Sequence, residues 1–479
     1  MIAVFRVDSS NKIGIGHLIR CINISEQIKK KVDKIYFITK SRHTFNFIKK
    51  NTNFESKIIC KKKNNLKKKE INDANETIKV LSKINKKILL IVDNYSLSSK
   101  WESLVKPHCL KLVSIDDFKK KHHSDLLINY NNFKKNNDIQ KLYGFDFSIL
   151  NTQIKKSQNN KKDIVVSFGG SDREKLTTFV TKILKKLNLK SKIYIFLGNF
   201  NNQIDDLKKV ISSSKNIKVI KFSKKYFYYL KKAKFIVCGG GTTCMETVLM
   251  GINSIVFNVS KNQNNQTKFL SKNKLINLIK YRNKNNLVKN KLIYLIKKLN
   301  NKNYKNFNLE NQTLIDEYGV KRICEVLFPS NFSKVNAKKA SAKDIKIYFK
   351  WYNDPLNRKF ALKKNIINFK NHKKWFLKAI KNKNIKFFIF KIENLPIGQV
   401  RLDYKGNNIL IDYYLDKVVR GRGWGKKILS YVINGVKLKK NKHFIGVVNK
   451  KNFSSIKTFK NLNFKETRLN KNNFKTFNL

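Results

Sequence analysis

The sequence predicts an α/β protein with two Rossmann-like domains, followed by a smaller α+β domain. Through about residue 330, short apolar runs alternate with longer amphipathic stretches, which is the βαβ rhythm of parallel sheets. After Pro329 the pattern changes to helix-rich sequence, then to antiparallel-looking strands and one glycine-rich loop. The polar stretch KKSQNNKK reads as a linker between the first two domains. We place the domains at residues 1–153, 163–328 and 337–479.

The strands are expected where apolar residues run together, because parallel strands covered by helices on both faces lose the polar alternation. In the first two domains these runs are residues 2–7, 34–38, 88–92, 112–115, 164–168, 193–197, 217–220, 235–237 and 254–259. In the last domain they are residues 387–392, 398–403, 409–415 and 444–448.

Composition indicates a folded chain of 479 residues, since 41% apolar residues can fill several cores. The formal net charge of +73, from 104 basic and 31 acidic residues, suggests a polyanionic partner. However, only 11 of the basic residues are arginine, and the lysines are spread along the whole chain. Base readout and bidentate phosphate contacts depend on arginine, so we do not expect nucleic-acid binding to be the main role.

The six cysteines form no CxxC pair and have no metal-ligand spacing with the seven histidines. This usage is typical of a reduced compartment, so we expect neither disulfides nor a bound metal. The N-terminus lacks a signal-peptide pattern, and no apolar run approaches the length of a membrane helix. We therefore expect a cytoplasmic protein that does not bind membranes.

The segment FRVDSSNKIGIGHLIR reads as a strand, a glycine-bearing loop and the start of a helix. Gly14 and Gly16 let the backbone approach a ligand closely. His17 would lie at the helix N-terminus, where the macrodipole favours a neutral imidazole that can accept a proton. A purely structural histidine is the alternative. The nearby Arg6 and Arg20, at the carboxyl end of the first strand, favour a ligand site.

The first motif resembles the opening of the nucleotide-sugar hydrolases of pseudaminic acid biosynthesis, which release UDP from UDP-2,4-diacetamido-2,4,6-trideoxy-β-L-altropyranose. The resemblance continues through V-D-N-Y at 92–95, the DD…H-x-D…N segment at 116–129, and Asp316, Gly319 and Arg322, covering about residues 1–328. Asn151 departs from it, because family members usually carry arginine there. The resemblance implies that His17, Tyr95 and Asn262 are catalytic and that Arg6, Asp8, Gly14, Gly16 and Arg20 contact the UDP-sugar.

Two further glycine loops each follow a strand and precede a helix, where backbone N–H groups can hold phosphate. They are GGSD at 169–172 and GGGTTCME at 239–246, and plain structural turns are the alternative. Together they resemble the UDP site of glycosyltransferase B folds, with Glu246 in the ribose position. The implied UDP contacts are Gly170, Ser171, Gly240, Gly241, Thr242, Thr243 and Glu246. Asn262 matches the family's Asn-Gln pair and would hold the sugar or the attacking water, although a plain polar loop is the alternative.

UDP is a good leaving group, so hydrolysis needs positioning, phosphate stabilisation and one group that aligns and deprotonates water. His17 fits that role. A pair of glycosidase carboxylates is unnecessary, and Asp116 and Asp117 would point to opposite faces of a strand.

In the last domain, an alternating strand leads into the loop RGRGWG at 420–425 and then a helix, an arrangement that can form an anion nest. The R-x-x-G-x-G spacing resembles the pyrophosphate loop of GCN5-related N-acetyltransferases. The resemblance implies acetyl-CoA contacts from Leu415, Arg420, Gly421, Arg422, Gly423, Trp424, Gly425 and Asn452. Two positions depart from the family pattern: Phe459 replaces the tyrosine that protonates the thiolate, and Asn463 replaces a glycine.

The segment from Trp351 to Phe376 resembles the acetyltransferase that acts one step before UDP-sugar hydrolysis in the same pathway. Arg358 and His372 are the expected contacts of the acetyl acceptor. Trp351 and Trp375 could stack on the nucleotide or sugar, but core packing is favoured for both.

The two resemblances together predict a bifunctional enzyme that N-acetylates the 4-amino group of a UDP-amino sugar and then hydrolyses the product to free sugar and UDP. One alternative is a UDP-sugar glycosyltransferase joined to an acetyltransferase, and a second is a nucleic-acid-binding protein. The sequence leaves open the stereochemistry of the sugar, the oligomeric state, and whether the acetyltransferase is active with Phe459.

Overall fold

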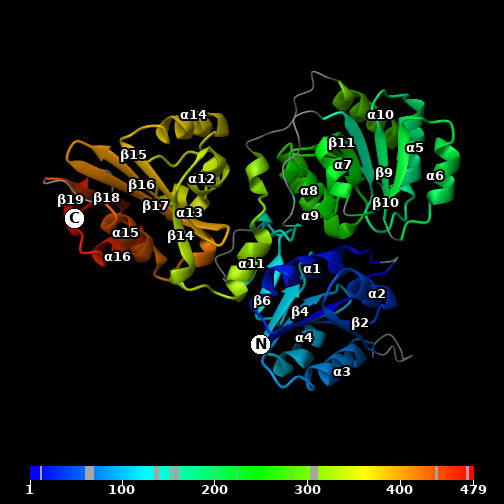
Figure 1. The fold of residues 1–479 in the computed structure, drawn as a ribbon, viewed down its shortest axis with the longest axis horizontal. Helices are drawn as coiled ribbons and strands as arrows, with labels where there is room; N and C mark the ends of the chain where they lie inside the picture. Colours follow the sequence, from blue (N-terminus) through cyan, green and yellow to red (C-terminus); the bar gives the residue numbers. More distant parts are fainter. Residues whose placement is uncertain are drawn as a thin grey trace. The chain divides into compact units, whose positions relative to one another are not determined.

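A computed structural model describes residues 1–10, 13–59, 69–133, 140–151, 154, 161–198, 200–223, 225–281, 283–301, 311–436, 441–470 and 474–479. The chain divides into two compact units, Met1–Cys324 and Glu325–Leu479, and each is described by itself (Figure 1). Most of the expected linker, residues 155–160, lies outside the described residues.

The first sheet is parallel, with strand order β3-β2-β1-β4-β5-β6-β7. Its strands are β1 (Ile2–Val7), β2 (Lys34–Thr39), β3 (Glu55–Ile58), β4 (Ile88–Asp93), β5 (Lys111–Ile115), β6 (Leu126–Asn129) and β7 (Lys141–Tyr143). Its helices are α1 (Gly16–Ile28), α2 (Arg42–Asn51), α3 (Lys69–Leu81) and α4 (Ser99–Val105). Every residue of β4 is buried, as expected of a central strand covered on both faces.

The second sheet of this unit is also parallel, with strand order β10-β9-β8-β11-β12-β13. Its strands are β8 (Asp163–Ser167), β9 (Ile193–Leu197), β10 (Ile217–Lys221), β11 (Ala233–Gly239), β12 (Asn253–Asn258) and β13 (Asn277–Lys280). The helices that follow in the chain are α5 (Leu176–Lys186), α6 (Ile204–Ile211), α7 (Tyr226–Lys232), α8 (Thr242–Met250), α9 (Asn264–Lys272), α10 (Asn286–Asn300) and α11 (Gly319–Leu327).

In both sheets the chain reverses its direction of winding between two central strands, which are β1 and β4 in the first and β8 and β11 in the second. In open α/β sheets, ligands bind beyond the carboxyl ends of the strands at this switch point. The loops singled out from the sequence follow β1, β8 and β11, so the topology places all three at ligand-binding positions.

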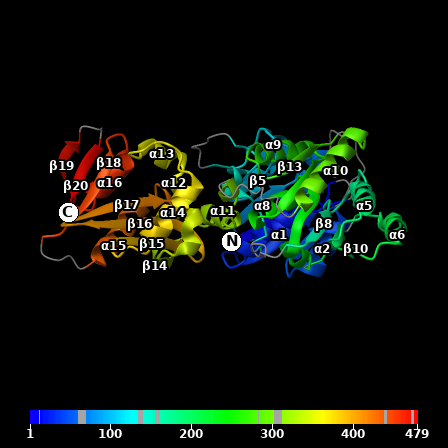
Figure 2. The ribbon, with the colours of Figure 1, turned by 90° about the horizontal axis from the view of Figure 1, so that it is seen from above.

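The second unit has a mixed sheet of order β14-β15-β16-β17-β18-β20-β19 (Figure 2). Its strands are β14 (Val335–Lys339), β15 (Ile385–Ile392), β16 (Leu395–Lys405), β17 (Asn408–Leu415), β18 (His443–Asn449), β19 (Lys465–Asn470) and β20 (Phe474–Asn478). Its helices are α12 (Ile345–Tyr352), α13 (Pro355–Phe360), α14 (Phe369–Ala379), α15 (Trp424–Asn434) and α16 (Phe453–Lys460). All neighbouring strands are antiparallel except β17 and β18.

β17 and β18 pair only at their beginnings, from Asn408 with His443 to Ile411 with Gly446. Beyond that point β17 continues to Leu415 beside β16, while β18 continues beside β20. The two strands therefore diverge immediately before the glycine-rich loop.

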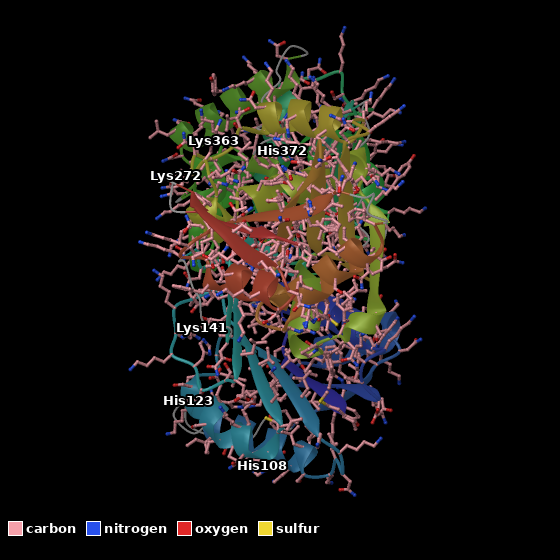
Figure 3. All side chains as sticks on the ribbon, turned by 90° about the vertical axis from the view of Figure 1, so that its left-hand side faces the viewer. His108, His123, Lys141, Lys272, Lys363 and His372 are labelled. Carbon is pink, nitrogen blue, oxygen red and sulfur yellow. The ribbon has the colours of Figure 1, made fainter. Side chains whose placement is uncertain are left out.

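The predicted fold class is confirmed: two Rossmann-like domains with parallel sheets, followed by an α+β domain with a mixed sheet. Among the described residues, no helix has the length and apolar character needed to cross a membrane. Exposed lysines lie on separate elements of the chain, including Lys141, Lys272 and Lys363 (Figure 3).

Candidate active sites

His17 is the second residue of α1, directly after the first glycine loop. Gly14 has φ of +80°, a conformation that favours glycine and turns the chain from β1 into the helix. The N-cap residue Ile15 provides no side-chain hydrogen bond to the first turn of the helix. The imidazole is 6% exposed and therefore sits in a largely closed pocket at the end of the sheet.

A carboxylate that the sequence analysis did not assign holds this imidazole. Asp93, the last residue of β4, is fully buried, and its Oδ1 lies 2.5 Å from His17 Nδ1. Arg20 Nη2 is also 3.0 Å from Nδ1, but the shorter carboxylate contact assigns the proton to Nδ1. The other ring nitrogen, Nε2, is then left with its lone pair and can accept a proton.

Arg20 holds the residues around His17 in place. It donates to both oxygens of Asp93, at 2.9 and 2.7 Å, and to Asp117 and the Tyr130 hydroxyl, each at 2.7 Å. Burial alone would raise the pKa of Asp93, but Arg20 and His17 outweigh it and hold that pKa below its usual range. Arg20 is 3% exposed and its hydrogen bonds hold the site residues in place, and its contact with the UDP-sugar stays a prediction.

Arg6 and Asp8, also predicted to contact the UDP-sugar, are engaged with other residues of the protein. Arg6 is 0% exposed and forms ion pairs with Asp73 at 2.6 Å and Asp8 at 2.8 Å. Asp8 also accepts hydrogen bonds from Thr39 and from the Lys40 N–H. These two residues brace β1 against its neighbours, and Arg6 has no exposed surface to offer a ligand.

The three residues predicted to be catalytic lie together. The rings of His17 and Tyr95 meet edge to face with centroids 4.2 Å apart. The Tyr95 hydroxyl donates to Asp117 and accepts from Asn262 Nδ2 at 3.3 Å. Burial raises the pKa of Tyr95 well above its usual range, so the phenol stays neutral. Asn262 comes from the short turn after β12, so both Rossmann-like domains contribute to this cluster.

The loop containing Gly170 and Ser171 lies against the first glycine loop. A Cβ at Gly170 would come within 3.0 Å of the Ile15 side chain, and one at Gly14 within 3.9 Å of Ser171 Oγ. Asp172 accepts from the N–H groups of Leu176 and Thr177 at the start of α5. The structure thus brings the loops after β1 and β8 together, as the predicted UDP-sugar site requires.

The loop after β11 leads into α8, which begins at Thr242 behind Gly241, with no side-chain cap on its first turn. Gln266 donates to the carbonyls of Gly240 and Gly241 at 2.8 and 3.0 Å, and the Gly240 N–H donates to the Phe257 carbonyl at 3.0 Å, so these contacts fix the loop. Gly240 must be glycine, because a Cβ there would lie 2.5 Å from Thr267 Cγ2. Thr242, Thr243 and Glu246 are all partly exposed.

Glu246 lies one turn into α8, where burial raises its pKa to about 7. A carboxylate in the first turns of a helix, with a pKa near neutrality, is suited to hydrogen-bond the hydroxyl groups of a ribose.

Sequence reasoning missed Asp93, Asp117 and Tyr130 as site residues. Asp93 is the last residue of β4 and Asp117 follows the end of β5, and a position at the carboxyl end of a parallel strand could have indicated both as site residues.

In the second unit, the loop before α15 contains two left-handed glycines, Gly421 with φ of +75° and Gly423 with φ of +73°. Gly423 is the N-cap of α15 and supplies no side-chain bond to the first turn. Gly425 lets the helix approach α16, since a Cβ there would be 3.3 Å from Thr458 Oγ1. The loop therefore offers backbone N–H groups to an anion, as predicted.

The arginine side chains of this loop contact other residues of the protein, and their contact with acetyl-CoA stays a prediction. Arg420 donates to the Leu415 carbonyl at 2.9 Å and the Tyr414 hydroxyl at 2.6 Å. Arg422 donates to Glu325 and to the Ser330 carbonyl, both at 2.6 Å, and lies over the Trp424 ring. Trp424 is 3% exposed. The anion-binding capacity of the loop thus lies in its main chain.

Leu415 ends the stretch of β17 that has diverged from β18, so its backbone lies beside the opening of the sheet. Asn452 caps α16 by accepting from the Ser455 N–H at 3.2 Å. Phe459 is 2% exposed and packs so closely on Gly446 that a Cβ there would be 2.5 Å from its ring.

The acceptor role of Arg358 and His372 stays a prediction, and the structure shows other contacts for both side chains. His372 is 2% exposed among aromatic rings, and burial lowers its pKa to about 4 (Figure 3). Arg358 donates to the Lys363 carbonyl at 3.0 Å and so fastens the loop after α13. Trp351 is a core residue at 2% exposure, as favoured, whereas Trp375 is 39% exposed and is not.

The described part of the chain contains no cluster of three or more histidine, cysteine, aspartate or glutamate side chains able to hold a metal ion.

Comparison with known proteins relates the first unit to enzymes of nucleotide-sugar chemistry. Residues 164–327 match the sequence model of the glycosyltransferase family 28 C-terminal domain. The UDP-2,4-diacetamido-2,4,6-trideoxy-beta-L-altropyranose hydrolase of Campylobacter jejuni is 24% identical over 57% of this chain and 97% of its own length. The resemblance read from the motifs is confirmed. An uncharacterized protein of Methanocaldococcus jannaschii is 23% identical over 97% of both chains.

Among solved structures, MurG of Acinetobacter baumannii matches 68% of this chain and 99% of its own, with 12% identity and a TM-score of 0.50. This similarity concerns the fold of the first unit. The N-acetyltransferase PseH of Campylobacter jejuni matches 30% of this chain and 96% of its own, with 16% identity and a TM-score of 0.24.

Proposed function

We propose that the chain is a bifunctional enzyme of UDP-sugar metabolism. Its first unit hydrolyses UDP-2,4-diacetamido-2,4,6-trideoxy-β-L-altropyranose to the free sugar and UDP. Its second unit transfers an acetyl group from acetyl-CoA to the 4-amino group of the preceding UDP-amino sugar. The observation that carries the first activity is the His17–Asp93 pair, which meets Tyr95 and Asn262 beside the glycine loops after β1 and β8.

In the hydrolysis, the N–H groups at the start of α8 and the loop after β8 hold the diphosphate, and Glu246 accepts from the ribose hydroxyls. His17 Nε2 takes a proton from water while the water oxygen forms a bond to the anomeric carbon. The bond from that carbon to the diphosphate oxygen breaks, and UDP leaves with the electron pair. Asp93 stabilises the imidazolium that results.

For the acetyl transfer, the main chain of the Gly421–Gly423 loop and the open start of α15 fit the pyrophosphate of coenzyme A. The diverging end of β17 leaves unpaired main-chain groups on the side facing away from β16, which suits an extended pantetheine arm. Acetyl-CoA would supply the acetyl group as a thioester.

The test follows UDP release by phosphorus NMR from the UDP-4-amino sugar, with and without acetyl-CoA. Release only with acetyl-CoA is the expected result and would establish both activities and their order. Release from the preformed diacetamido sugar alone would leave the first activity standing and remove the second. His17→Ala should abolish UDP release and leave acetyl transfer intact, and retained hydrolysis in this variant would overturn the role of His17.

The match to a glycosyltransferase domain favours one second candidate, a UDP-sugar glycosyltransferase joined to an acetyltransferase. That function predicts little UDP release in water alone, and release that depends on an added sugar acceptor. The same NMR measurement separates the two functions, because the hydrolase needs no acceptor besides water.

A further inference from the structure

A histidine in the loop after β5 lies between two carboxylates. We call residues 116–123 the β5 loop. His122 of this loop has a side chain that is 11% exposed, and its Nδ1 is 2.7 Å from Glu102 Oε1. Its Nε2 is 3.6 Å from Asp116 Oδ2, and Asp116 also accepts from the Phe118 N–H at 3.0 Å. Burial by itself would lower the pKa of His122, but the two carboxylates outweigh it and raise that pKa to about 9. The imidazole is therefore a cation at neutral pH.

Glu102 anchors this arrangement from α4. Its carboxylate accepts from Ser114 Oγ at 2.5 Å, from His122 Nδ1 at 2.7 Å and from the His123 N–H at 2.6 Å. Burial alone would raise the pKa of Glu102, but these three donors hold that pKa below its usual range. His123, the histidine of the H-x-D motif, is exposed and takes part through its main chain.

The charged groups around His122 come from α4, from the turn that follows α4, and from the β5 loop. Glu102 is on α4 and Asp116 is in the loop, and both are 3% exposed. Lys106, in the turn after α4, donates to the His123 carbonyl at 3.1 Å and so fastens the end of the loop. His122 thus carries the positive charge that balances the two buried carboxylates where the loop meets α4.

The β5 loop also forms one wall of the predicted hydrolytic site. Asp117 accepts from the Tyr95 hydroxyl, and the Phe118 ring meets the Tyr95 ring edge to face with centroids 4.9 Å apart. Lys120 Nζ donates to the Tyr95 carbonyl at 2.5 Å. The loop therefore holds Tyr95 through its ring, its hydroxyl and its main chain, and the other side of that ring meets His17.

From these contacts we infer that Glu102 and His122 are positioning residues for UDP-sugar hydrolysis, and that the charge on His122 keeps Tyr95 in its working orientation. The imidazolium offers one N–H to each carboxylate, whereas the neutral ring has a single N–H for both. Loss of the proton leaves two buried carboxylates without a balancing charge, and the β5 loop then loosens from α4. This inference rests on the proposed hydrolysis.

The hydrolysis should accordingly have an alkaline limit set by His122. The pKa of an ordinary histidine is 6.5 and that of His122 is about 9, so the folded protein keeps a proton that the unfolded chain has released. The contribution of this charge is complete below pH 6.5 and is lost as the pH rises through about 9. Burial raises the pKa of Tyr95 well above its usual range, so the phenol stays neutral over the same interval.

The test measures UDP release from the diacetamido UDP-sugar by the full-length protein between pH 7 and pH 10. In wild type, kcat should fall about tenfold as the pH passes about 9, while KM changes less than about twofold. His122→Gln should already be about tenfold slower at pH 7 and should lack this alkaline step. Glu102→Gln should move the step to lower pH, because one carboxylate raises the pKa of His122 less than two do. His108→Gln, at an exposed histidine after α4, is the matched control and should keep the wild-type profile.

A fluorine probe reports on the β5 loop independently of activity. Para-fluorophenylalanine at position 118 places a group that does not titrate beside the Tyr95 ring. Its fluorine NMR shift should change with a midpoint near pH 9 in the otherwise wild-type protein and should stay constant in the His122→Gln background. If His122→Gln does not fold, Glu102→Gln provides the comparison, because its midpoint should be lower.

The outcomes separate this inference from the proposed function. An alkaline step that persists in His122→Gln, or equal kcat in His122→Gln and wild type at pH 7, would overturn the inference. A wild-type protein that releases no UDP would instead remove the proposed hydrolysis, and a fluorine transition abolished by His122→Gln would then still support the role of the pair in positioning Tyr95. A fluorine shift that stays constant from pH 7 to pH 10 in the His122 protein would overturn the inference whatever the first unit catalyses.

Discussion

At the scale of single residues, the proposed hydrolase site depends on one buried carboxylate with two roles. Asp93 orients the imidazole of His17 through one oxygen and is held by Arg20 through both. A buried ion pair of this kind gives little net stability, because desolvation offsets most of the attraction. Its contribution is to fix the tautomer and direction of the catalytic base.

Asp93→Asn should therefore lower kcat for UDP release by about 100-fold or more, with a smaller effect on KM, because an amide cannot fix the same tautomer or stabilise an imidazolium. Assays of UDP release from the diacetamido UDP-sugar measure this change in kcat. Asp125→Asn, in the same domain but bonded to the Leu112 N–H and Lys106, is the control. Equal rates in Asp93→Asn and wild type would contradict the assignment of the proton to Nδ1.

Glu246 illustrates the conflict between function and stability at one position. Burial raises its pKa from 4.5 to about 7, so the folded protein holds a proton there that the unfolded chain releases. This stability is present below about pH 4.5 and is lost as the pH rises through about 7. Above that range the charged carboxylate costs on the order of 3 kcal/mol.

Glu246→Gln should then raise the melting temperature at alkaline pH but not at acidic pH, as measured by thermal unfolding across that range. It should also weaken binding of the UDP-sugar, whose diphosphate diester does not itself titrate near neutrality. In wild type, affinity should rise with pH through about 7, because the ionised carboxylate is the better acceptor for ribose hydroxyls. A variant with unchanged affinity and the same pH profile would remove Glu246 from the ribose site.

At the scale of elements, the sequence was informative for most strands that are buried on both faces, although β6, whose four residues are all buried, was not among the expected runs. β4, β8 and β11 are almost entirely apolar and buried, so their runs identified them and the loops that follow. The edge strands β3 and β7 were missed, because their residues ESKI and KLY are mostly exposed and carry no apolar run.

Residue roles were harder to predict than elements, for a physical reason. Arg6 pairs with Asp73, which is 67 residues away in the sequence, and Arg20 pairs with Asp117, which is 97 residues away. Sequence motifs mark charged residues near a site but do not show whether a partner elsewhere has already paired with them. Residues whose function lies in the backbone, such as Gly14 and Gly423, were therefore placed better than arginines.

The loop before α15 should be the element most sensitive to substitution in the acetyltransferase unit. Gly423→Val places a β-branched side chain at φ of +73°, which is strained whatever space surrounds it, and turns the N–H groups at the start of α15. We expect loss of acetyl-CoA binding by isothermal titration and full retention of UDP release from the diacetamido sugar. Gly406→Ala, in the β16–β17 turn at φ of +56°, is the control for local strain alone. Unchanged acetyl-CoA affinity in Gly423→Val would contradict the assignment of this loop to acetyl-CoA binding.

At the scale of the whole molecule, the formal charge of +73 acts against the compact state. The positive charges are spread over many elements, so their mutual repulsion is long-ranged and is screened once the Debye length falls to about 10 Å. Adding sodium chloride to a low-salt buffer should therefore raise the midpoint of each thermal transition, whereas sucrose of equal osmolality should raise it less. A midpoint that falls with salt would mean that attractive ion pairs outweigh this repulsion.

The two proposed activities on one chain raise the question of whether the intermediate passes directly between them. A free UDP-sugar mixes through the solution far faster than a typical enzyme turns over, at about 10 per second. Joining the units by itself therefore gives no kinetic advantage unless transfer is direct. We expect a mixture of His17→Ala, which only acetylates, and Gly423→Val, which only hydrolyses, to release UDP from the UDP-4-amino sugar with the same lag as wild type at equal concentrations of each site. His17→Ala alone should accumulate the diacetamido UDP-sugar without UDP. A longer lag in the mixture than in wild type would show that the intermediate is handed over within the chain.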